Sequence, residues 1–295
     1  MNSIDIESKK FLGQPKNFVS IFNALLFDGK QVLKPEYLKD ENSELVMNVS
    51  SKHVDIIKRY EDGTYLDLFV IESQSYVDPS MVARVMEYES IARMRYIRQN
   101  FKNHVPISTR LPMILTVVLY VGESKWNAAK RLSELEIIHP GFEAMFNEFQ
   151  LNLIELNTNH KYNTGEKATQ DFFDLLSMIY RKQILKEDLD REFNRDALYF
   201  AYVVTKNKEL LSIYNKSEKG DVKVCRALDE MFEESTNKGI QMGIKQGFEQ
   251  GIEQGIELNR FEVYQTMLDK GFSVKAIASI FSVSEESIKK LLMKA

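Results

Sequence analysis

The fold of this chain is decided by residues 53–75, whose sequence is His53-Val-Asp-Ile-Ile-Lys-Arg-Tyr-Glu-Asp-Gly-Thr-Tyr-Leu-Asp-Leu-Phe-Val-Ile-Glu-Ser-Gln-Ser75. Two runs rich in β-branched and aromatic residues flank Asp62-Gly63, a dipeptide that supplies the positive φ angles of a tight type I′ turn. The stretch therefore predicts a β-hairpin. It carries three polar residues where the core hairpin of a sheet would be apolar, namely Asp55, Glu72 and Gln74.

The predicted turn sets the register of the two strands. If Asp62-Gly63 is the two-residue loop, counting outward places Asp55 opposite Val70. Glu72 is then the diagonal neighbour of Asp55, about 7 to 8 Å away on the same face. Because strand side chains alternate with period two, Gln74 joins the two carboxylates on that face. Two carboxylates at this separation can share one divalent metal ion.

Asp55 and Glu72 therefore form a candidate site for Mg²⁺ or Mn²⁺, because hard cations take oxygen ligands and keep several waters. Such an ion lowers the pKa of a bound water and neutralises charge on a scissile phosphate, as phosphodiester hydrolysis requires. Gln74 cannot ionise, although its amide can orient a water or a phosphate oxygen. The alternative interpretation makes Asp55 an edge-strand charge and Glu72 the start of an ordinary loop before Pro79.

Four segments of the chain carry a family resemblance. They are residues 21–35; residues 71–88, where Glu-x-Gln is followed by Met, Arg and Tyr at fixed offsets; residues 117–122 with Trp126; and residues 224–230. Together they resemble the recombination-promoting nuclease and transposase family, a branch of the PD-(D/E)XK nuclease superfamily whose last motif is Glu-x-Gln. The wider superfamily has Lys where this chain has Gln74, so the chemistry would depend more heavily on the metal.

The resemblance implies a restriction-endonuclease-like α/β fold, with a mixed sheet flanked by helices and an α-helical C-terminal region. It also implies a metal-dependent DNA endonuclease that acts in recombination, in mobile elements or in defence. In this interpretation Asp55, Glu72 and Gln74 are catalytic, and the first two bind the metal. Because Gln74 replaces Lys, a catalytically inert DNA-binding or oligomeric adaptor on a nuclease scaffold is the alternative.

A basic helix is predicted to begin after Pro79, since proline favours the first turn of a helix. Along it, one stripe of residues recurs at steps of three and four: Arg84, Tyr88, Ile91, Arg95, Arg98 and Lys102. The net charge of −4 does not favour a nucleic-acid binder, so local charge must supply the phosphate contacts. We expect all four basic residues to bind DNA, with Arg84 near the metal and Arg95, Arg98 and Lys102 along a groove; the alternative is a solvated face with salt-bridged arginines.

The order of apolar patterns predicts four parts. These are a nuclease-like domain at 1–165, a helical layer at 166–236, a Gly-rich helix or linker at 237–259, and a helix-turn-helix-like tail at 260–295. Within the first part we expect helices near 17–27 and 125–136, and strands near 113–121 and 149–156. Strands that alternate with helices indicate a mixed sheet covered on both faces.

The Gly-rich part has glycine at every fourth position, at residues 239, 243, 247, 251 and 255. Each glycine costs a helix interior about 1 kcal/mol relative to alanine, so an isolated helix here is marginal. A period of four exceeds 3.6, so the glycine row winds around the helix. One interpretation is close approach of a second helix, such as the same segment of another subunit in a homo-oligomer. The other is a flexible linker.

The C-terminal tail has the pattern of a helix-turn-helix. Ser273 and Ser284 are placed to cap two short helices. A DNA-reading helix usually presents Arg, Lys, Asn or Gln to base edges, and Glu285-Glu286 is a poor reader. The tail is therefore open to interpretation either as an interaction or dimerisation element or as a DNA-targeting one.

Composition excludes several classes of protein. A single cysteine, Cys225, excludes an intramolecular disulfide framework and suits a reducing cytosol. The N-terminus lacks the apolar core of a signal peptide, and the longest apolar run, near 111–121, is too short to span a bilayer. Four scattered histidines show no zinc-ligand spacing. We expect a cytoplasmic protein with DNA as partner and no membrane association.

Overall fold

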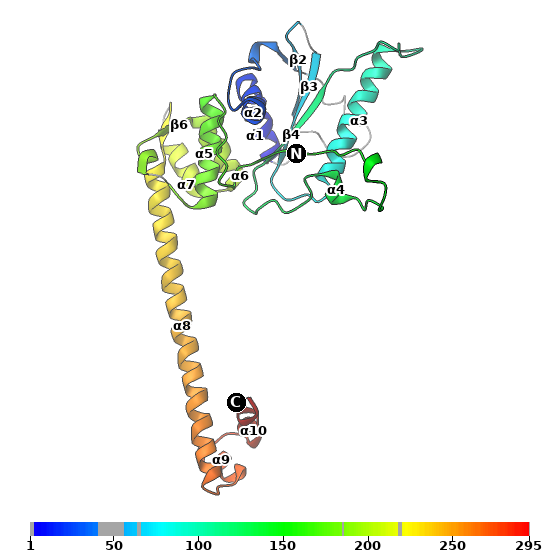
Figure 1. The fold of residues 1–295 in the computed structure, drawn as a ribbon. Helices are drawn as coiled ribbons and strands as arrows, with labels where there is room; N and C mark the ends of the chain where they lie inside the picture. The colour runs from blue at the N-terminus through cyan, green and yellow to red at the C-terminus, as the bar shows by residue number, and fades with distance from the viewer. Residues whose placement is uncertain (1–2, 41–55, 64–65, 185, 218–219, 295) are drawn as a thin grey trace. The chain divides into compact units, whose positions relative to one another are not determined.

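The structure is a computed structural model that describes residues 3–40, 56–63, 66–184, 186–217 and 220–294. It divides into two units, Met1–Asp229 and Glu230–Ala295 (Figure 1). The division falls inside one long helix, α8, which runs from Cys225 to Asp269.

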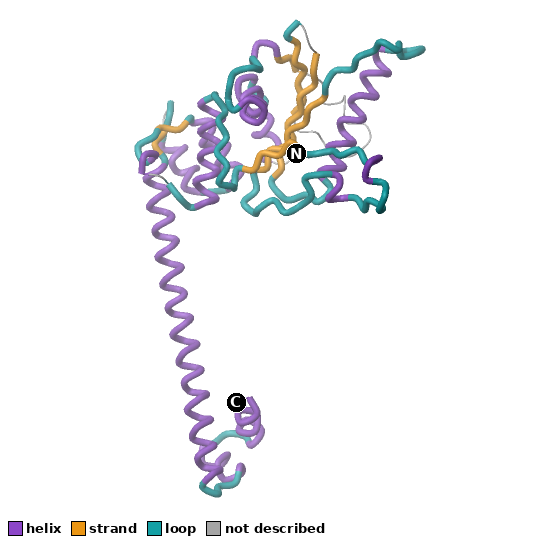
Figure 2. Tube along the Cα trace, in the orientation of Figure 1, coloured by secondary structure: helices purple, strands orange, loops and turns teal. Residues whose placement is uncertain are grey.

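A five-stranded mixed sheet is the centre of the first unit, where Figure 2 draws its strands in orange. Its strands are β1 (Leu38–Asp40), β2 (Ile56–Glu61), β3 (Leu66–Gln74), β4 (Ile114–Tyr120) and β5 (Asn152–Glu155), in that spatial order. β1, β2 and β3 pair antiparallel, whereas β4 lies parallel to both β3 and β5. The predicted hairpin and the two later strands are all present, and the mixed α/β fold is confirmed.

The register of the hairpin differs from the prediction by two residues. Val70 is opposite Ile57, not Asp55, and Glu61 is opposite Leu66. Four residues thus separate the innermost pair instead of two; among them, Gly63 has a φ of +89°. A shift of two residues leaves every side chain on its predicted face, so the apolar alternation does not distinguish the two registers.

Packing on the sheet favours the observed register. Tyr60 and Phe69 are diagonal neighbours in it, and their ring centroids lie 5.7 Å apart. Phe69 also stacks on Phe22 at 4.8 Å, which ties the hairpin to the helix beneath it. Such aromatic contacts across strands and layers contribute about 0.5–1.5 kcal/mol each beyond their buried area.

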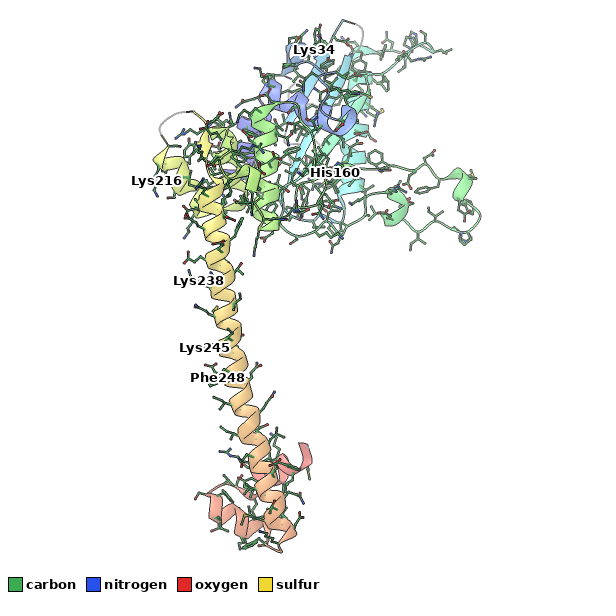
Figure 3. All side chains as sticks on the ribbon, turned by 60° about the vertical axis from the view of Figure 1, so that its left-hand side comes forward. Lys34, His160, Lys216, Lys238, Lys245 and Phe248 are labelled. Atoms are coloured by element: carbon green, nitrogen blue, oxygen red, sulfur yellow. The ribbon has the colours of Figure 1, made fainter. Side chains whose placement is uncertain are left out.

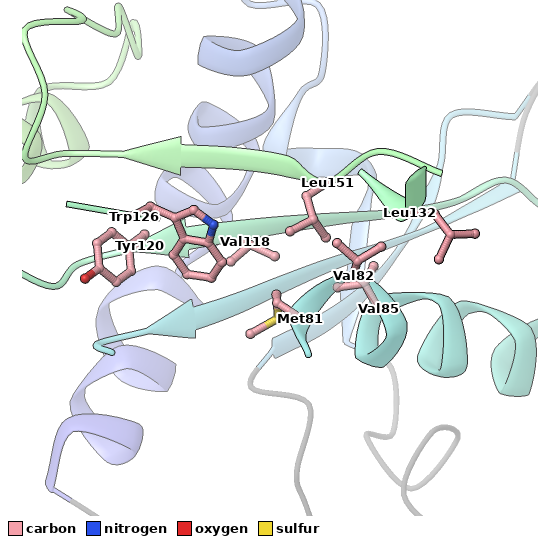
Figure 4. Packing of buried hydrophobic residues seen from close by; sticks show 8 residues of the cluster. All are labelled: Met81, Val82, Val85, Val118, Tyr120, Trp126, Leu132 and Leu151. Carbon is pink, nitrogen blue, oxygen red and sulfur yellow. The ribbon is translucent and has the colours of Figure 1, made fainter. Parts of the chain in front are cut away.

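Helices cover both faces of the sheet, as predicted. α2 (Pro15–Phe27) contributes Phe22 to one face, and α3 (Met81–Asn100) covers the other. α3 begins two residues after Pro79, and its buried face carries Val85 and Tyr88. Figure 4 shows the core that α3 builds with the sheet and the following loops, formed by Met81, Val82, Val85, Val118, Tyr120, Trp126, Leu132 and Leu151.

The predicted helix at 125–136 is wrong for most of its length, because only the short α4 (Leu132–Leu135) forms. The backbone before it pairs with the segment that leads into β5. Leu132 N donates to Phe149 O, and Leu151 N donates to Lys130 O, both at 2.9 Å. Trp126 is buried in the core and its Nε1 donates to Ala128 O. These contacts hold the segment extended.

The rest of the first unit is mainly helical. Its helices are α1 (Ser3–Leu12), α5 (Lys167–Arg181), α6 (Arg195–Thr205) and α7 (Lys208–Lys216), with short 3-10 turns at Pro35–Tyr37, Glu143–Met145 and Lys186–Asp188. Phe172 of α5 packs against Phe11 of α1 and Phe200 of α6, with centroids 5.5 and 4.5 Å away. A two-stranded sheet, β6 (Glu192–Phe193) with β7 (Val222–Lys223), was not predicted.

The second unit contains most of α8 followed by two short helices, α9 (Val274–Phe281) and α10 (Glu285–Lys294). The Gly-rich repeat lies inside α8 and is helical. Tyr264, Ile277, Ala278 and Ile288 form a small core between these helices. Ser273 Oγ accepts from Ala276 N, so this predicted cap is present. Among the described residues, no helix is both long enough and apolar enough to cross a bilayer.

Candidate functional site

Glu72 and Gln74 lie at the C-terminal end of β3, on the sheet face that α3 covers. Leu68 and Val70 share this face by the period-two alternation of the strand, and both belong to the core beneath Tyr88 of α3. Glu72 is 3% exposed and Gln74 is 4% exposed. The structure therefore brings these two predicted site residues together on one buried surface.

Asp55, the third member of the predicted site, lies outside the described residues. The described part of β2 begins at Ile56, which is opposite Ile71. Ile71 directly precedes Glu72. The observed register thus brings the described end of β2 to the level of the predicted metal site.

Arg84 contacts Glu72 directly. Its Nη2 donates to Glu72 Oε1 at 2.7 Å, and its Nη1 donates to Asp78 Oδ2 at 2.6 Å. Its Nε also donates to the phenol oxygen of Tyr88 at 3.0 Å. Ser80 N and Oγ donate to Asp78 Oδ1, so the turn before α3 fixes this carboxylate. The guanidinium therefore joins the end of β3 to the start of α3.

The charges of this network stabilise one another. Burial opposes the charged form of Arg84, but the hydrogen bonds that it donates to Asp78 and Tyr88 and the charge of Glu72 raise its pKa above the ordinary value. Burial likewise opposes the charge of Asp78, but hydrogen bonds from Ser80 and Arg84 lower its pKa overall. Burial and the Glu72 charge raise the pKa of Tyr88. At neutral pH the network thus contains a charged arginine, an ionised Asp78 and a neutral phenol.

Gln74 offers a buried donor at the same place. Within the described part of the chain, its Nε2 atom is buried and has no hydrogen-bond partner. Its backbone is engaged, since Gln74 O accepts from Val121 N at 2.9 Å. Buried polar atoms are nearly always hydrogen-bonded, so this amide indicates a position where an acceptor from a ligand or a water belongs.

The described residues fit a hard divalent cation in donor type but contribute few donors. Glu72 and Gln74 supply oxygen atoms, which suit Mg²⁺ or Mn²⁺ better than zinc. Across the described ranges, no group of three or more His, Cys, Asp or Glu side chains is arranged to hold a metal. Glu72 is the described carboxylate at the predicted centre, and the second predicted ligand is Asp55.

Comparison with protein families agrees with this geometry. The model of the family described as "Putative transposase, YhgA-like" matches residues 9–210, about two thirds of the chain. The chain belongs to the YhgA-like transposase family. This family is part of the PD-(D/E)XK nuclease superfamily, and it indicates a nuclease-like role in mobile elements and an interaction with DNA. Neither the curated proteins nor the solved structures gave a match.

In this transposase-family domain, the residues of the predicted basic stripe fall into two separate groups. Arg84 is 13% exposed and is engaged with two carboxylates. Arg98 is exposed on the same helix, 14 residues and therefore about 21 Å further along. Arg95 is half-buried, and Lys102 follows the end of α3 at Asn100, so its predicted place on the helix is wrong. The predicted stripe therefore joined Arg84, which belongs to the buried network, to a separate and more exposed group of charges.

Sequence reasoning missed two buried carboxylates near the candidate site. Asp78 was not singled out, although its position two residues before the helix cap Ser80 is a typical signal for a turn that begins a helix. Glu155 also escaped notice. In the sheet, Gln74 pairs with Tyr120 and Tyr120 pairs with Glu155, which places this second buried carboxylate in the same cross-strand row. Lys130 forms an ion pair with Glu155.

Proposed function

We propose that the chain is a metal-dependent DNA endonuclease that hydrolyses phosphodiester bonds, with Asp55 and Glu72 binding Mg²⁺ or Mn²⁺. The observation that carries this proposal is the buried carboxylate of Glu72, fixed at the end of β3 by Arg84 at 2.7 Å and next to the unsatisfied amide of Gln74. Recombination, transposition or defence is the proposed context, in keeping with the family.

The described end of β2 lies beside the proposed site, because Ile56 is opposite Ile71, the residue that directly precedes Glu72. Asp55 directly precedes Ile56 in the sequence, and we propose it as the second carboxylate that shares the ion with Glu72. When bound, the ion would supply a water of lowered pKa and neutralise charge on the scissile phosphate.

The neighbouring side chains have separate tasks in this proposal. Arg84 is a positioning residue, because it holds Glu72 Oε1 and compensates its charge without belonging to the metal site. Gln74 Nε2 donates to a phosphate oxygen or to the attacking water. Arg95, Arg98 and Lys102 contact the DNA backbone beyond the site.

The experiment is plasmid cleavage by the purified chain in Mg²⁺, compared with Asp55→Asn and Glu72→Gln. We expect both variants to lose at least 100-fold in rate. The matched control is Glu89→Gln, which removes another buried carboxylate, one that lies on α3 five residues after Arg84 and has its own arginine partner, Arg93. Cleavage by the two site variants at the rate of the control would show that Asp55 and Glu72 do not form the active site.

A second readout does not depend on turnover. A ligand that binds only the folded state stabilises it by about 2.7 kcal/mol at 100 times its dissociation constant. Mg²⁺ should therefore raise the unfolding midpoint of the wild type and leave that of Glu72→Gln unchanged.

The second candidate is a catalytically inert DNA-binding or oligomeric adaptor, and Gln74 is the observation that favours it. Gln74 stands where the wider superfamily has a lysine, and an amide cannot ionise. The site therefore lacks the positive charge that the lysine would supply. A salt-sensitive gel shift without cleavage in any divalent metal would support the adaptor. A gain of cleavage in Gln74→Lys would instead identify a slow active site.

A further inference from the structure

The middle of α8 presents two unpartnered rows along the helix. The first row is apolar and follows each glycine by one residue: Ile240, Ile244, Phe248, Ile252 and Ile256, which are 55, 68, 69, 48 and 47% exposed. The second row is the glycines themselves, where an added Cβ would have no described atom within 4 Å apart from its chain neighbours and the adjacent backbone of α8. Figure 3 shows this stretch, with Lys238, Lys245 and Phe248 labelled.

Helical geometry places three of the five residues of each row on one common face. At 100° per residue, six positions fall within an arc of about 100° that extends for about 22 Å along α8. They are Ile240, Ile244, Gly247, Phe248, Gly251 and Gly255. No charged residue between positions 238 and 258 falls inside this arc. The N-terminal half of the face is thus made by large apolar side chains and the C-terminal half by glycines.

We propose that this face binds the same face of a second copy of the chain in antiparallel orientation, with the two-fold axis between Gly247 and Phe248. In that arrangement Phe248 lies against the partner's Gly247, and Ile244 lies against the partner's Gly251. Ile240 lies against the partner's Gly255. Each apolar side chain therefore enters a notch where a glycine leaves the partner backbone open. A parallel pair would place isoleucine on isoleucine and glycine on glycine, so the two halves would not fit.

The charges of this stretch lie on the other side of α8 from the face, but their order along the helix favours the same orientation. The basic residues Lys238 and Lys245 lie in its N-terminal half, whereas Glu249, Glu253 and Glu257 lie in its C-terminal half. Antiparallel pairing sets each basic half beside the acidic half of the partner and also opposes the two helix dipoles. Parallel pairing would bring the two acidic halves together. The charge pattern and the shape pattern therefore select one arrangement.

The repeat also explains why so poor a helix-forming sequence is helical. Glycine is the weakest helix former apart from proline, and five occur within this part of α8. Glycine rows on helices permit close approach of a second backbone, which restores packing along the row. A second copy would cover the exposed apolar side chains at the same time.

The first test is the oligomeric state of the full chain by sedimentation equilibrium across the micromolar range. We expect a monomer–dimer equilibrium whose dissociation constant rises at least tenfold in Gly251→Leu, which fills a notch. Gly239→Leu is the matched control, because it makes the same change outside the face and should alter the constant by less than twofold. A monomeric wild type, or equal effects of the two variants, would overturn the proposal. Neither result depends on DNA cleavage.

The orientation is tested by mixing two full-length variants, Ile240→Cys and Gly255→Cys, under mild oxidation. Cys225 does not compete, because it is buried and burial raises its pKa to about 11. Antiparallel pairing predicts a disulfide between the two different variants. Disulfides formed within each variant alone would overturn the antiparallel order.

Discussion

Replacing Arg84 by methionine is expected to destabilise the first unit by about 3 kcal/mol at pH 7. The side chains of Arg84, Glu72 and Asp78 are 13, 4 and 10% exposed, so the ion pairs are buried. Removing one partner of a buried pair costs roughly 3–5 kcal/mol, because a charge is left without compensation. The lower end applies, since Asp78 keeps its hydrogen bonds from Ser80.

The single tryptophan makes this effect measurable in a chain of two units. Trp126 is 3% exposed and packs in the core beneath α3, so its fluorescence during urea unfolding reports on the first unit. The control is Arg98→Met, an exposed change on the same helix, which should remain within about 0.5 kcal/mol of the wild type. The pair Arg84→Met with Glu72→Gln should recover part of the loss, because the stranded charge is removed.

The pH dependence of the stability difference between wild type and Arg84→Met can refute this reasoning. Hydrogen bonds lower the pKa of Asp78 in the folded state, so its contribution is complete above its unfolded pKa of about 3.9. That contribution disappears as the pH falls through the folded pKa. The difference between wild type and Arg84→Met should therefore shrink below about pH 4. An Arg84→Met loss no larger than that of Arg98→Met, or one unchanged in acid, would show that the network does not hold this site together.

Three further outcomes are expected. Arg191→Met should cost about 3 kcal/mol in urea unfolding, since it leaves the buried Asp171 short of a cation, whereas Arg226→Met breaks an exposed pair and should cost less than about 1 kcal/mol. The Cys225 thiol should react with a disulfide reagent only after unfolding, because burial raises its pKa to about 11. If the chain cuts DNA as an α8-paired dimer, Gly251→Leu should shift the plasmid products from linear toward nicked circles in gel analysis.

The sequence was sufficient to place Glu72 and Gln74 on one face, because strand alternation does not depend on tertiary contacts. It was also sufficient to begin α3 after Pro79. It was not sufficient for the register. A slip of two residues preserves every face, so the decision rests on packing such as the ring contact between Tyr60 and Phe69, which no local pattern encodes.

The hydrogen bonds of Arg84 to Glu72 and Asp78 could not be predicted from local sequence patterns, for a related reason. Arg84 was placed on a stripe with other basic residues, which periodicity alone supports. Whether a guanidinium faces solvent or a carboxylate depends on how the helix packs on the sheet, and here Tyr88 turns that side of α3 toward Glu72. The failed helix at 125–136 has the same origin, because the backbone of Lys130 and Leu132 pairs with a segment some twenty residues away.

Charge balance at the proposed metal site gives a further argument for a cation. Two carboxylates about 5 Å apart repel by roughly 3 kcal/mol at an effective dielectric constant of 20. Arg84 offsets only part of such repulsion, because its charge is shared between Glu72 and Asp78. If Asp55 joins Glu72 as proposed, the site has three carboxylates and one guanidinium, and therefore an excess of two negative charges. A divalent cation balances that excess, so the charge balance supports the proposal that Asp55 and Glu72 bind one metal ion.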